Sequence, residues 1–375
     1  MKIAIVCYPT FGGSGVVATE LGIELSKKGH EIHFITYSQP VRLEALNAKL
    51  HFHEVNVPQY SLFKFQPYEL ALSSRLVDVV KENNIDILHV HYAIPHAYAA
   101  YMAKKMLEDE GIKIPIVTTL HGTDITLVGS HPFYKSAVSF SINNSDCITA
   151  VSKSLKNDTI ELFEIEKEIE VIHNFIDVEK FLIKKTPCER NLLAKEDEKI
   201  VVHISNFRPL KRIMDVIYVF EQISVKIKAK LIMIGEGPEK SKAQRYCMKN
   251  NLSDKVVFLG NTSEVYDILC FSDLFLLLSE KESFGLSALE AMIHKVPVIS
   301  TNVGGLPELN KNKYSGFLFD IGEINKMAKK SIEILSNNQL LNKYKNQAFE
   351  NAKRFDIKKI IKEYESVYKK AIEIK

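Results

Sequence analysis

Short apolar runs alternate with amphipathic segments along nearly the whole chain of 375 residues. In segment 16–28, Val17, Leu21 and Leu25 recur at every fourth position, and Gly29 follows as a typical helix end. Alternation of strands with helices predicts βαβ units and parallel sheets, which makes this an α/β protein. The expected strands are 2–7, 31–36, 87–91, 116–120 and 147–151, followed by 199–205, 230–234, 255–259, 274–278 and 298–301.

The alternation loosens in the polar stretch 174–199 and then starts again. A chain of this length exceeds one ordinary hydrophobic core, so two domains are expected. We predict a Rossmann-like domain over 1–173, a hinge over 174–199 and a second Rossmann-like domain over 200–350. The remainder, 351–375, carries an amphipathic helix that is free to pack back on the first domain. Ligands bind outside the carboxyl ends of strands in such sheets.

Composition narrows the class of protein. Hydrophobic residues make up 46% of the chain and charged residues 25%, the balance of a soluble globular protein. The net charge of +3 gives no reason to expect nucleic acid as a partner, and no apolar run is long enough for stable membrane insertion. The five cysteines are scattered without a C-x-x-C pair, which favours a cytoplasmic protein. Composition leaves a homo-oligomer open.

A glycine-rich loop follows the first apolar run. Gly13, Gly15 and Ala18 fit the G-x-G-x-x-A pattern of a dinucleotide-binding turn. An NAD site also needs an acidic residue at the end of the second strand, but Tyr-Ser-Gln-Pro stands at 37–40. The loop therefore favours close approach of backbone N–H groups to another anion. A tight turn that binds nothing is the alternative.

A basic turn, S-N-F-R-P-L-K-R, follows the first strand of the second half. Beside Asn206, it carries Arg208 as a bidentate fork and Lys211 as a compact point charge, which together could clamp a diphosphate. An ordinary solvated turn is the alternative without further context.

That context comes from E-K-E-S-F-G-L-S-A-L-E-A-M, which follows an apolar strand and contains Glu282 and Glu290. A helix is expected to begin near Gly285 or Leu286, so the free N–H groups from Phe284 onward form an anion site. The two carboxylates suit sugar hydroxyls on either side of a phosphate. The apolar residues around them argue against a merely solvated helix face.

These motifs resemble the retaining glycosyltransferases of family 4, which have the GT-B fold. The E-x7-E motif spans 282–290, and the matching segments 205–212, 234–239 and 302–308 fall in the family's order. The resemblance covers essentially the whole chain and implies two Rossmann-like domains that face each other across a cleft.

The first half narrows the resemblance. Segments 7–15, 89–97 and 118–126 are similar to the members that transfer N-acetylglucosamine from UDP-N-acetylglucosamine to the hydroxyl of L-malate in bacillithiol biosynthesis. The resemblance implies release of UDP and retention of the anomeric configuration. A lipid, a glycan or another hydroxy acid as acceptor stays open. A UDP-N-acetylglucosamine 2-epimerase or a non-catalytic nucleotide-sugar binder fits the combined motifs less well.

Roles follow from the resemblance, residue by residue. It implies catalytic roles for His121, Arg208, Lys211 and Glu282, and donor binding by Gly13, Gly15, Asn206, Phe284, Gly285, Leu286 and Glu290. Malate carries two carboxylates and needs hydrogen-bond donors, for which Ser14, Tyr92, Thr119 and Arg75 are candidates in the first domain.

Neither a metal nor another cofactor is expected, because the chain has no D-x-D triplet and cationic side chains must neutralise the leaving group. The segment H-V-H places His89 and His91 on one face of a strand near His96, which raises a metal site as a rival. Local hydrogen bonding of these histidines is the favoured alternative, since no third ligand stands at a regular spacing. His51 and His53 give a metal still less support.

Overall fold

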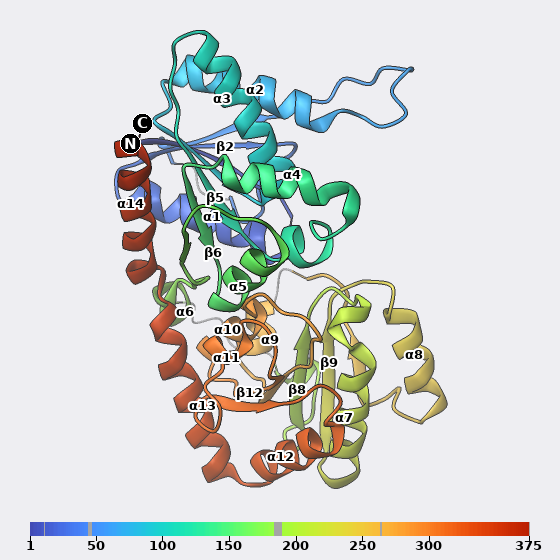
Figure 1. Cartoon of the computed structure of the whole chain (residues 1–375). Coiled ribbons are helices and arrows are strands. Elements are labelled where there is room, and N and C mark those ends of the chain that lie inside the picture. The colour runs from blue at the N-terminus through green and yellow to red at the C-terminus, as the bar shows by residue number, and fades with distance from the viewer. Residues whose placement is uncertain (11, 44–46, 184–189, 263–264, 375) are drawn as a thin grey trace. The chain divides into compact units, whose positions relative to one another are not determined.

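The computed structural model describes residues 1–10, 12–43, 47–183, 190–262 and 265–374. The chain forms two compact units (Figure 1). The first contains Met1–Asn174 together with Ile357–Lys375, and the second contains Phe175–Asp356. The C-terminal helix therefore belongs to the same unit as the N-terminus.

The first unit is built on a seven-stranded parallel sheet with the strand order β3-β2-β1-β4-β5-β6-β7. Its strands are β1 (Lys2–Val6), β2 (Glu31–Thr36), β3 (Leu50–Glu54), β4 (Ile87–His91), β5 (Ile116–Leu120), β6 (Cys147–Ala150) and β7 (Ile169–Val171). Its helices are α1 (Gly13–Lys27), α2 (Tyr68–Asn83), α3 (Tyr98–Asp109), α4 (Pro132–Asn143), α5 (Lys153–Leu162) and α14 (Ile357–Ile374), with short turns η1 (Ala93–Ala97) and η2 (Thr123–Leu127).

Helices cover both faces of this sheet. Leu88 and Val90 of β4 pack into a core with residues of α2 and α3. Because successive side chains of a strand point to opposite faces, His89 and His91 point the other way. On that face the Tyr368 hydroxyl of α14 lies 2.8 Å from His89 Nδ1. The terminal helix is thus tied to the strand that leads to the candidate site.

The second unit holds a six-stranded parallel sheet with the order β10-β9-β8-β11-β12-β13. Its strands are β8 (Lys199–Ile204), β9 (Ala229–Ile234), β10 (Val256–Phe258), β11 (Leu274–Leu277), β12 (Val298–Thr301) and β13 (Gly316–Phe319). Its helices are α6 (Val178–Ile183), α7 (Ile213–Lys226), α8 (Lys240–Lys249), α9 (Val265–Leu269), α10 (Leu286–Ile293), α11 (Leu306–Leu309), α12 (Ile324–Ser336) and α13 (Asn338–Ala352), with short turns η3 (Arg190–Leu192), η4 (Pro209–Lys211) and η5 (Lys353–Phe355).

All ten strands expected from the apolar runs are present, and none of their ends differs by more than one residue from the prediction. The sequence did not indicate β3, β7 and β13, which are short and partly exposed. From Phe175 onward, the stretch predicted to be a hinge belongs to the second unit and contains α6 and η3. Residues 184–189 of that stretch lie outside the described residues.

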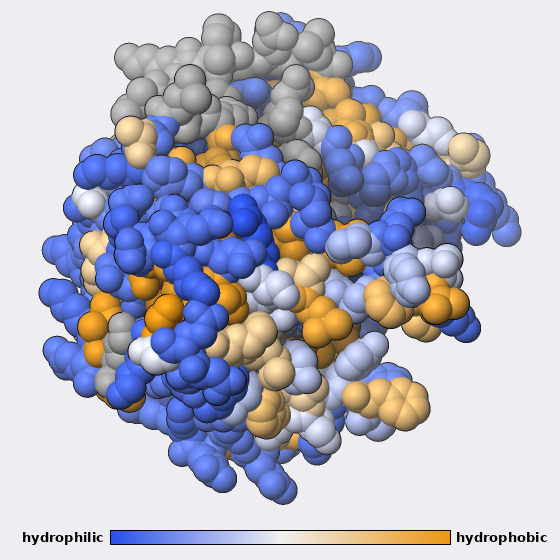
Figure 2. Space-filling view, turned by 90° about the horizontal axis from the view of Figure 1, so that it is seen from above, coloured by the Kyte–Doolittle hydropathy of each residue, from blue (hydrophilic) through white to orange (hydrophobic). Residues whose placement is uncertain are grey.

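The face seen in Figure 2 is mainly hydrophilic, with apolar residues in separate groups. Exposed large apolar side chains recur between positions 60 and 70, namely Tyr60, Leu62, Phe63, Phe65 and Leu70. None of the helices in the described part of the chain is long and apolar enough to span a membrane. Among the described cysteines, Cys7, Cys147 and Cys247 are buried free thiols.

Candidate active site

The glycine loop of the first unit joins β1 to α1. Helix α1 begins at Gly13, and its N-cap residue Gly12 makes no capping bond with a side chain. A Cβ atom at Gly15 would overlap the backbone carbonyl oxygen of Tyr8 and lie 2.5 Å from that of Thr10. Glycine is needed at this position because the chain folds tightly over itself at the start of the helix. The N–H groups of Gly13 and Ser14 precede the first hydrogen bond of the helix, which runs from Gly15 to the Gly12 carbonyl at 3.1 Å, and such a helix start suits an anion.

Three candidate side chains meet beside this loop. The Ser14 hydroxyl lies 2.8 Å from the Tyr92 hydroxyl. The Tyr92 ring packs against the His121 ring with their centroids 5.2 Å apart. Tyr92 has φ 89, the left-handed region that non-glycine residues seldom adopt, which turns its side chain toward the loop at the end of β4. The structure therefore brings Ser14, Tyr92 and His121 together.

His121 is held from behind by a second imidazole. His91 Nδ1 lies 2.8 Å from His121 Nε2, and the rings stack with centroids 5.1 Å apart. Burial lowers the pKa of His121 to about 3 and that of His91 well below its usual range. Both rings are therefore neutral at pH 7, so one nitrogen of the pair donates and the other accepts. The contact fixes the orientation of His121 and leaves its Nδ1 for a ligand.

The H-G-T-D loop that carries His121 is anchored by Asp124. This buried carboxylate accepts hydrogen bonds from the backbone N–H groups of Ala93, Gly122 and His121, at 2.9, 2.9 and 3.2 Å. Burial outweighs these bonds and raises the pKa of Asp124 to about 6. The loop after β5 and the turn after β4 are thus fastened to one side chain.

Thr119 was predicted to bind malate together with Ser14 and Tyr92, but its side chain lies in a different environment from theirs. Its hydroxyl is buried, at 2.8 Å from His89 Nε2 and 2.7 Å from the Thr149 hydroxyl. His121 directly follows β5, and by the alternation of side chains Thr119 lies one step before it on the same side of the chain. This position makes it part of the support of the site.

The H-x-H segment is used for local hydrogen bonds. His89 contacts Thr119 and Tyr368, His91 contacts His121, and His96 Nδ1 lies 2.5 Å from the backbone carbonyl of His91. Within the described residues, these histidines do not form a cluster with the spacing of metal ligands. Among the described residues, Arg75 makes no hydrogen bond with Ser14 or Tyr92. Its positive charge instead helps to lower the pKa of His53, after the larger effect of burial.

The second unit presents a charged pair at the carboxyl ends of β8 and β11. Lys211 Nζ lies 2.6 Å from Glu282 Oε2, and the Ser279 hydroxyl donates to the same oxygen at 3.2 Å. Both side chains are about 15% exposed, so the pair is largely shielded from water. Arg208 is exposed, and the described residues offer it no ion-pair partner. Asn206, two residues before it, is also exposed. This edge therefore has a cation free to meet an anionic ligand.

Glycines allow the motif loops of this unit to pack backbone against backbone. A Cβ atom at Gly304, which has φ 54, would overlap the carbonyl oxygen of Glu282, and one at Gly305 would overlap that of Ser283. The Gly305 N–H also donates to the Glu282 carbonyl at 2.9 Å. The loop of G-G-L-P-E thus sets the position of the backbone that carries Glu282.

Helix α10 contributes the rest of this group. It begins at Leu286, after Gly285 with φ 96 and the buried Phe284, as the sequence predicted. Glu290 lies on its second turn, mostly buried, and accepts a hydrogen bond from the Tyr266 hydroxyl at 3.3 Å. The N–H groups of Leu286 and Ser287 precede the first hydrogen bond of the helix, which runs from Ala288 to the Gly285 carbonyl at 2.9 Å, and such a helix start suits an anion.

Each unit therefore gathers its own group of candidate residues. The first holds Gly13, Ser14, Gly15, Tyr92 and His121, and the second holds Asn206, Arg208, Lys211, Glu282, Phe284, Gly285, Leu286 and Glu290. Sequence reasoning did not assign roles to His91, Asp124 and Ser279. The H-x-H spacing could have indicated His91, because it predicts that the rings of His89 and His91 lie on the same face of the strand.

Comparison with known proteins gives these groups a family. Residues 11–180 match the family described as glycosyltransferase family 4, and residues 185–351 match glycosyl transferases group 1. The N-acetyl-alpha-D-glucosaminyl L-malate synthase of Bacillus anthracis is 47% identical over 98% of this chain and 96% of its own length. The chain belongs to glycosyltransferase family 4. As a family 4 glycosyltransferase it is an enzyme.

More distant relatives agree with this assignment. An uncharacterized glycosyltransferase of Methanocaldococcus jannaschii is 28% identical over 98% of both chains. Among solved structures, Anabaena HepE in complex with UDP and glucose has a TM-score of 0.80 at 20% identity, covering 98% of this family 4 glycosyltransferase and 99% of that chain. The sucrose-phosphate synthase of Thermosynechococcus elongatus has a TM-score of 0.81 at 18% identity and covers both chains completely. These likenesses confirm the GT-B class, with two parallel sheets.

Proposed function

We propose that this enzyme transfers N-acetylglucosamine from UDP-N-acetylglucosamine to the hydroxyl of L-malate with retention of configuration, as the first step of bacillithiol biosynthesis. One observation carries the choice of substrates: the 47% identity to the Bacillus anthracis malate synthase over almost the whole of both chains. The residues of each unit supply chemistry that suits this reaction.

The second unit supplies the groups for the donor. Arg208 and Lys211 bind the diphosphate and stabilise the negative charge that grows on UDP as it departs, and such electrostatic stabilisation often contributes more to catalysis than any other single effect. The ion pair with Glu282 fixes the Lys211 ammonium in place before the donor binds. Glu282 also accepts hydrogen bonds from hydroxyls of the transferred sugar through its second oxygen, and Glu290 holds the ribose.

The backbone around α10 completes the donor site. The N–H groups from Phe284 to Leu286 approach the phosphate, where the helix start favours negative charge. Asn206 and the loop of Gly13 and Gly15 add further polar contacts to the donor.

The first unit supplies the groups for the sugar and the acceptor. His121 is neutral and oriented by His91, so its Nδ1 hydrogen-bonds the sugar near the anomeric carbon. The paired hydroxyls of Ser14 and Tyr92 bind a carboxylate of malate. Thr119 acts indirectly, through its contact with the buried His89.

The bond changes are simple. The malate hydroxyl oxygen forms a bond to the anomeric carbon on the face that the diphosphate leaves, while the bond from that carbon to the phosphate oxygen breaks. The proton of the malate hydroxyl passes to the departing phosphate oxygen. UDP and the glycoside of malate are the products, and no redox step takes place.

We expect the transfer to proceed without a metal or another cofactor, because Arg208 and Lys211 carry the charge that a divalent cation would otherwise neutralise. Turnover should persist after treatment with EDTA. A loss of turnover that Mg²⁺ or Mn²⁺ restores would contradict this expectation. We also expect the enzyme to act in the cytoplasm, and a homo-oligomer is compatible with this role.

The test is a panel of acceptors supplied with UDP-N-acetylglucosamine to the purified enzyme. UDP release and product mass are scored for L-malate, D-malate, another hydroxy acid, glycerol and a short glycan. We expect L-malate to give the product with by far the greatest kcat/KM. If another acceptor gives product and L-malate does not, the proposed acceptor is wrong, whereas the family is unaffected.

A further inference from the structure

A second group of chemically active side chains lies at the far end of the sheet in the first unit. Glu31 and His33 lie on β2, and His51 lies on β3 as the register partner of His33. The candidate catalytic residues of this unit follow the carboxyl ends of its strands, whereas Glu31 is the first residue of β2 and His51 the second of β3. The cluster is therefore separate from the candidate active site.

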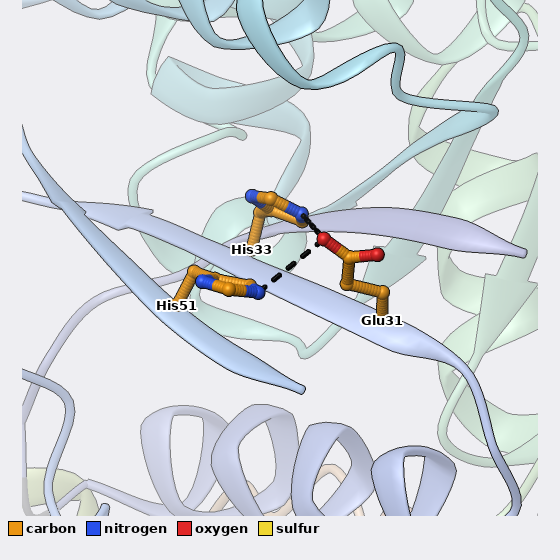
Figure 3. A group of neighbouring side chains, drawn as sticks. All are labelled: Glu31, His33 and His51. Atoms are coloured by element: carbon orange, nitrogen blue, oxygen red, sulfur yellow. Dashed lines mark hydrogen bonds and ion pairs between the residues drawn. The ribbon is translucent and has the colours of Figure 1, made fainter. Parts of the chain in front are cut away.

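The three side chains converge on one point, as Figure 3 shows. Glu31 Oε1 lies 3.2 Å from His33 Nε2 and 3.3 Å from His51 Nε2. All three candidate ligand atoms lie within 4.8 Å of one another. A tetrahedral Zn²⁺ with bonds of about 2.0 to 2.1 Å places neighbouring ligand atoms about 3.3 to 3.4 Å apart. The two distances from Glu31 Oε1 to the histidine nitrogens match this spacing.

The histidines are placed so that they can bind a metal. His33 is buried, and its Nε2 faces the Glu31 carboxylate at 3.2 Å. His51 Nε2 is shielded from water and has no hydrogen-bond partner of good geometry among the described residues.

His53 supplies the outer contact that a ligating histidine usually has. Its Nε2 lies 2.9 Å from His33 Nδ1, and the two rings are stacked almost parallel. If His33 donates its Nδ1 proton to His53, the lone pair of His33 Nε2 points at the cluster centre. Such a partner fixes the tautomer and orientation of a metal-bound imidazole.

Charge and access also suit a cation. Glu31 supplies one negative charge, and Lys2 contacts its other oxygen, Oε2, at 3.7 Å. The side chains of Glu31 and His51 are 34% and 39% exposed, which gives an ion a path from solvent and leaves room for a water as the fourth ligand. Two imidazoles and one carboxylate form a set that zinc accepts.

We propose that Glu31, His33 and His51 form a binding site for a divalent transition metal, with Zn²⁺ as the natural occupant. His53 is a positioning residue of this site. Because β3 is an edge strand that pairs with β2 alone, a bound ion fastens this edge to the sheet. The site stabilises the first unit and takes no part in glycosyl transfer.

The test uses the full chain without a histidine tag, freed of metal by EDTA and dialysed. Titration with Zn²⁺ is followed by calorimetry, Co²⁺ by its visible absorption, and both by the shift in Tm. We expect one ion per chain, a rise in Tm of a few degrees because the ion binds the folded chain preferentially, and the intense absorption of tetrahedral Co²⁺.

The variants H51Q and E31Q remove one ligand each at half-exposed positions, and both should bind Zn²⁺ at least tenfold more weakly with no metal-dependent rise in Tm. H30Q is the matched control, because His30 also pairs with a carboxylate, Glu365 at 3.1 Å. It should bind like the wild type. Transferase activity should be the same in H51Q, H30Q and wild type, with or without EDTA.

Two results would overturn the proposal. One is the absence of Zn²⁺ and Co²⁺ binding by the metal-free wild type at pH 7.5. The other is binding that H51Q and E31Q retain at full affinity, or that H30Q loses, since the ion would then lie elsewhere. Neither result would affect the transferase assignment, which is scored by product formation.

Discussion

At the residue scale, His91 fixes the orientation of His121, the imidazole expected nearest the reaction centre. It is fully buried and touches His121 through Nδ1, while its own Nε2 has no hydrogen-bond partner among the described residues. A buried N–H without a partner costs more than a buried lone pair in most structures. The favoured tautomer of His91 therefore donates from Nδ1 to His121 Nε2, which leaves an N–H at His121 Nδ1 for the sugar.

This arrangement predicts the effect of changing His91. In His91→Phe the ring remains but the hydrogen bond is lost, so kcat should fall by roughly five- to thirty-fold, corresponding to about 1 to 2 kcal/mol. The KM for UDP-N-acetylglucosamine should change little, because the donor groups of the second unit are intact. His91→Asn, which can place an amide N–H near the position of Nδ1, should recover part of the rate. Equal rates in His91→Phe and wild type, measured by UDP release, would rule out the positioning role.

The ion pair of Lys211 and Glu282 gives a second residue-scale prediction. Lys211→Ala removes a cation from the departing diphosphate, and kcat should fall by about 100-fold. Glu282→Ala should have a similar effect, since it releases Lys211 and loses a sugar contact. Lys228→Ala is the matched control, because Lys228 pairs with Asp197 in the same unit at 2.7 Å but is 77% exposed.

The control variant should retain the wild-type rate and Tm. Circular dichroism must show that all three variants are folded. Near-normal kcat in both Lys211→Ala and Glu282→Ala would contradict the assigned roles.

The sequence predicted Lys211 and Glu282 as site residues because each stands in a motif directly after a strand. It could not predict their direct contact, since that depends on how η4 and the loop before α10 meet. For Thr119, the sequence suggested a ligand contact that the structure does not show. Its place near the end of β5 suggested this contact, but the side-chain alternation of the strand directs its hydroxyl to His89 and Thr149.

At the scale of elements, close packing of loops holds Glu282 in position. Gly304→Ala forces a side chain against the Glu282 carbonyl and into a left-handed backbone conformation. The conformational strain alone costs about 1 to 2 kcal/mol, and overpacking adds about 1 to 3 kcal/mol. We expect a lower Tm and a loss of kcat of more than tenfold, because the backbone that carries Glu282 must shift.

Gly322→Ala is the control for this prediction. Gly322 also has a positive φ, 84, but no atom lies within 4 Å of an added Cβ. Its variant should show the strain in Tm while kcat stays at the wild-type value. If Gly304→Ala and Gly322→Ala have equal kcat, the packing of the two loops does not position Glu282.

Elements buried on both faces were the easiest to predict. Strands β4 and β5 are buried along their whole length and β1 is buried from Ile3 onward, and α10 begins where a glycine with positive φ precedes it. Strand β3 was missed because Leu-His-Phe-His-Glu is polar and half-exposed, a pattern that loops share. The histidines that signalled a polar loop are also the ones that converge with Glu31, which only the pairing of β2 with β3 reveals.

At the scale of the whole molecule, buried neutral histidines make stability depend on pH. Burial lowers the pKa of His89 and His121 to about 3 and that of His96 and His203 to about 4. The unfolded chain binds protons at these groups below about pH 6.5, whereas the folded chain does not until about pH 4. Stability is therefore present above pH 6.5 and is lost as the pH falls from 6.5 toward 4.

We expect the free energy of unfolding in urea to be nearly constant from pH 8 to 7 and to fall steadily between pH 6.5 and 4.5. Each buried histidine contributes at most about 1.4 kcal/mol per pH unit. His203→Gln should reduce this slope, because it removes one titrating group from the second unit. A free energy of unfolding that does not change between pH 7.5 and 5 would contradict the account of the buried imidazoles.

The whole-chain assignment depended on the set of motifs more than on any one of them. The glycine loop alone also fits a dinucleotide site, and the missing acid after β2 was needed to argue against it. Order along the chain and the two parallel sheets then agree with one family. The acceptor is the least determined feature, because hydroxyl groups such as those of Ser14 and Tyr92 can bind many anions.

The most direct measurement is the NMR spectrum of the product that the wild-type enzyme forms from UDP-N-acetylglucosamine and L-malate. We predict a single glycoside in which N-acetylglucosamine is α-linked to the hydroxyl oxygen of malate, with one UDP released for each product molecule. A β-linked product would contradict retention of configuration. The release of UDP without any glycoside of malate would contradict the proposed function.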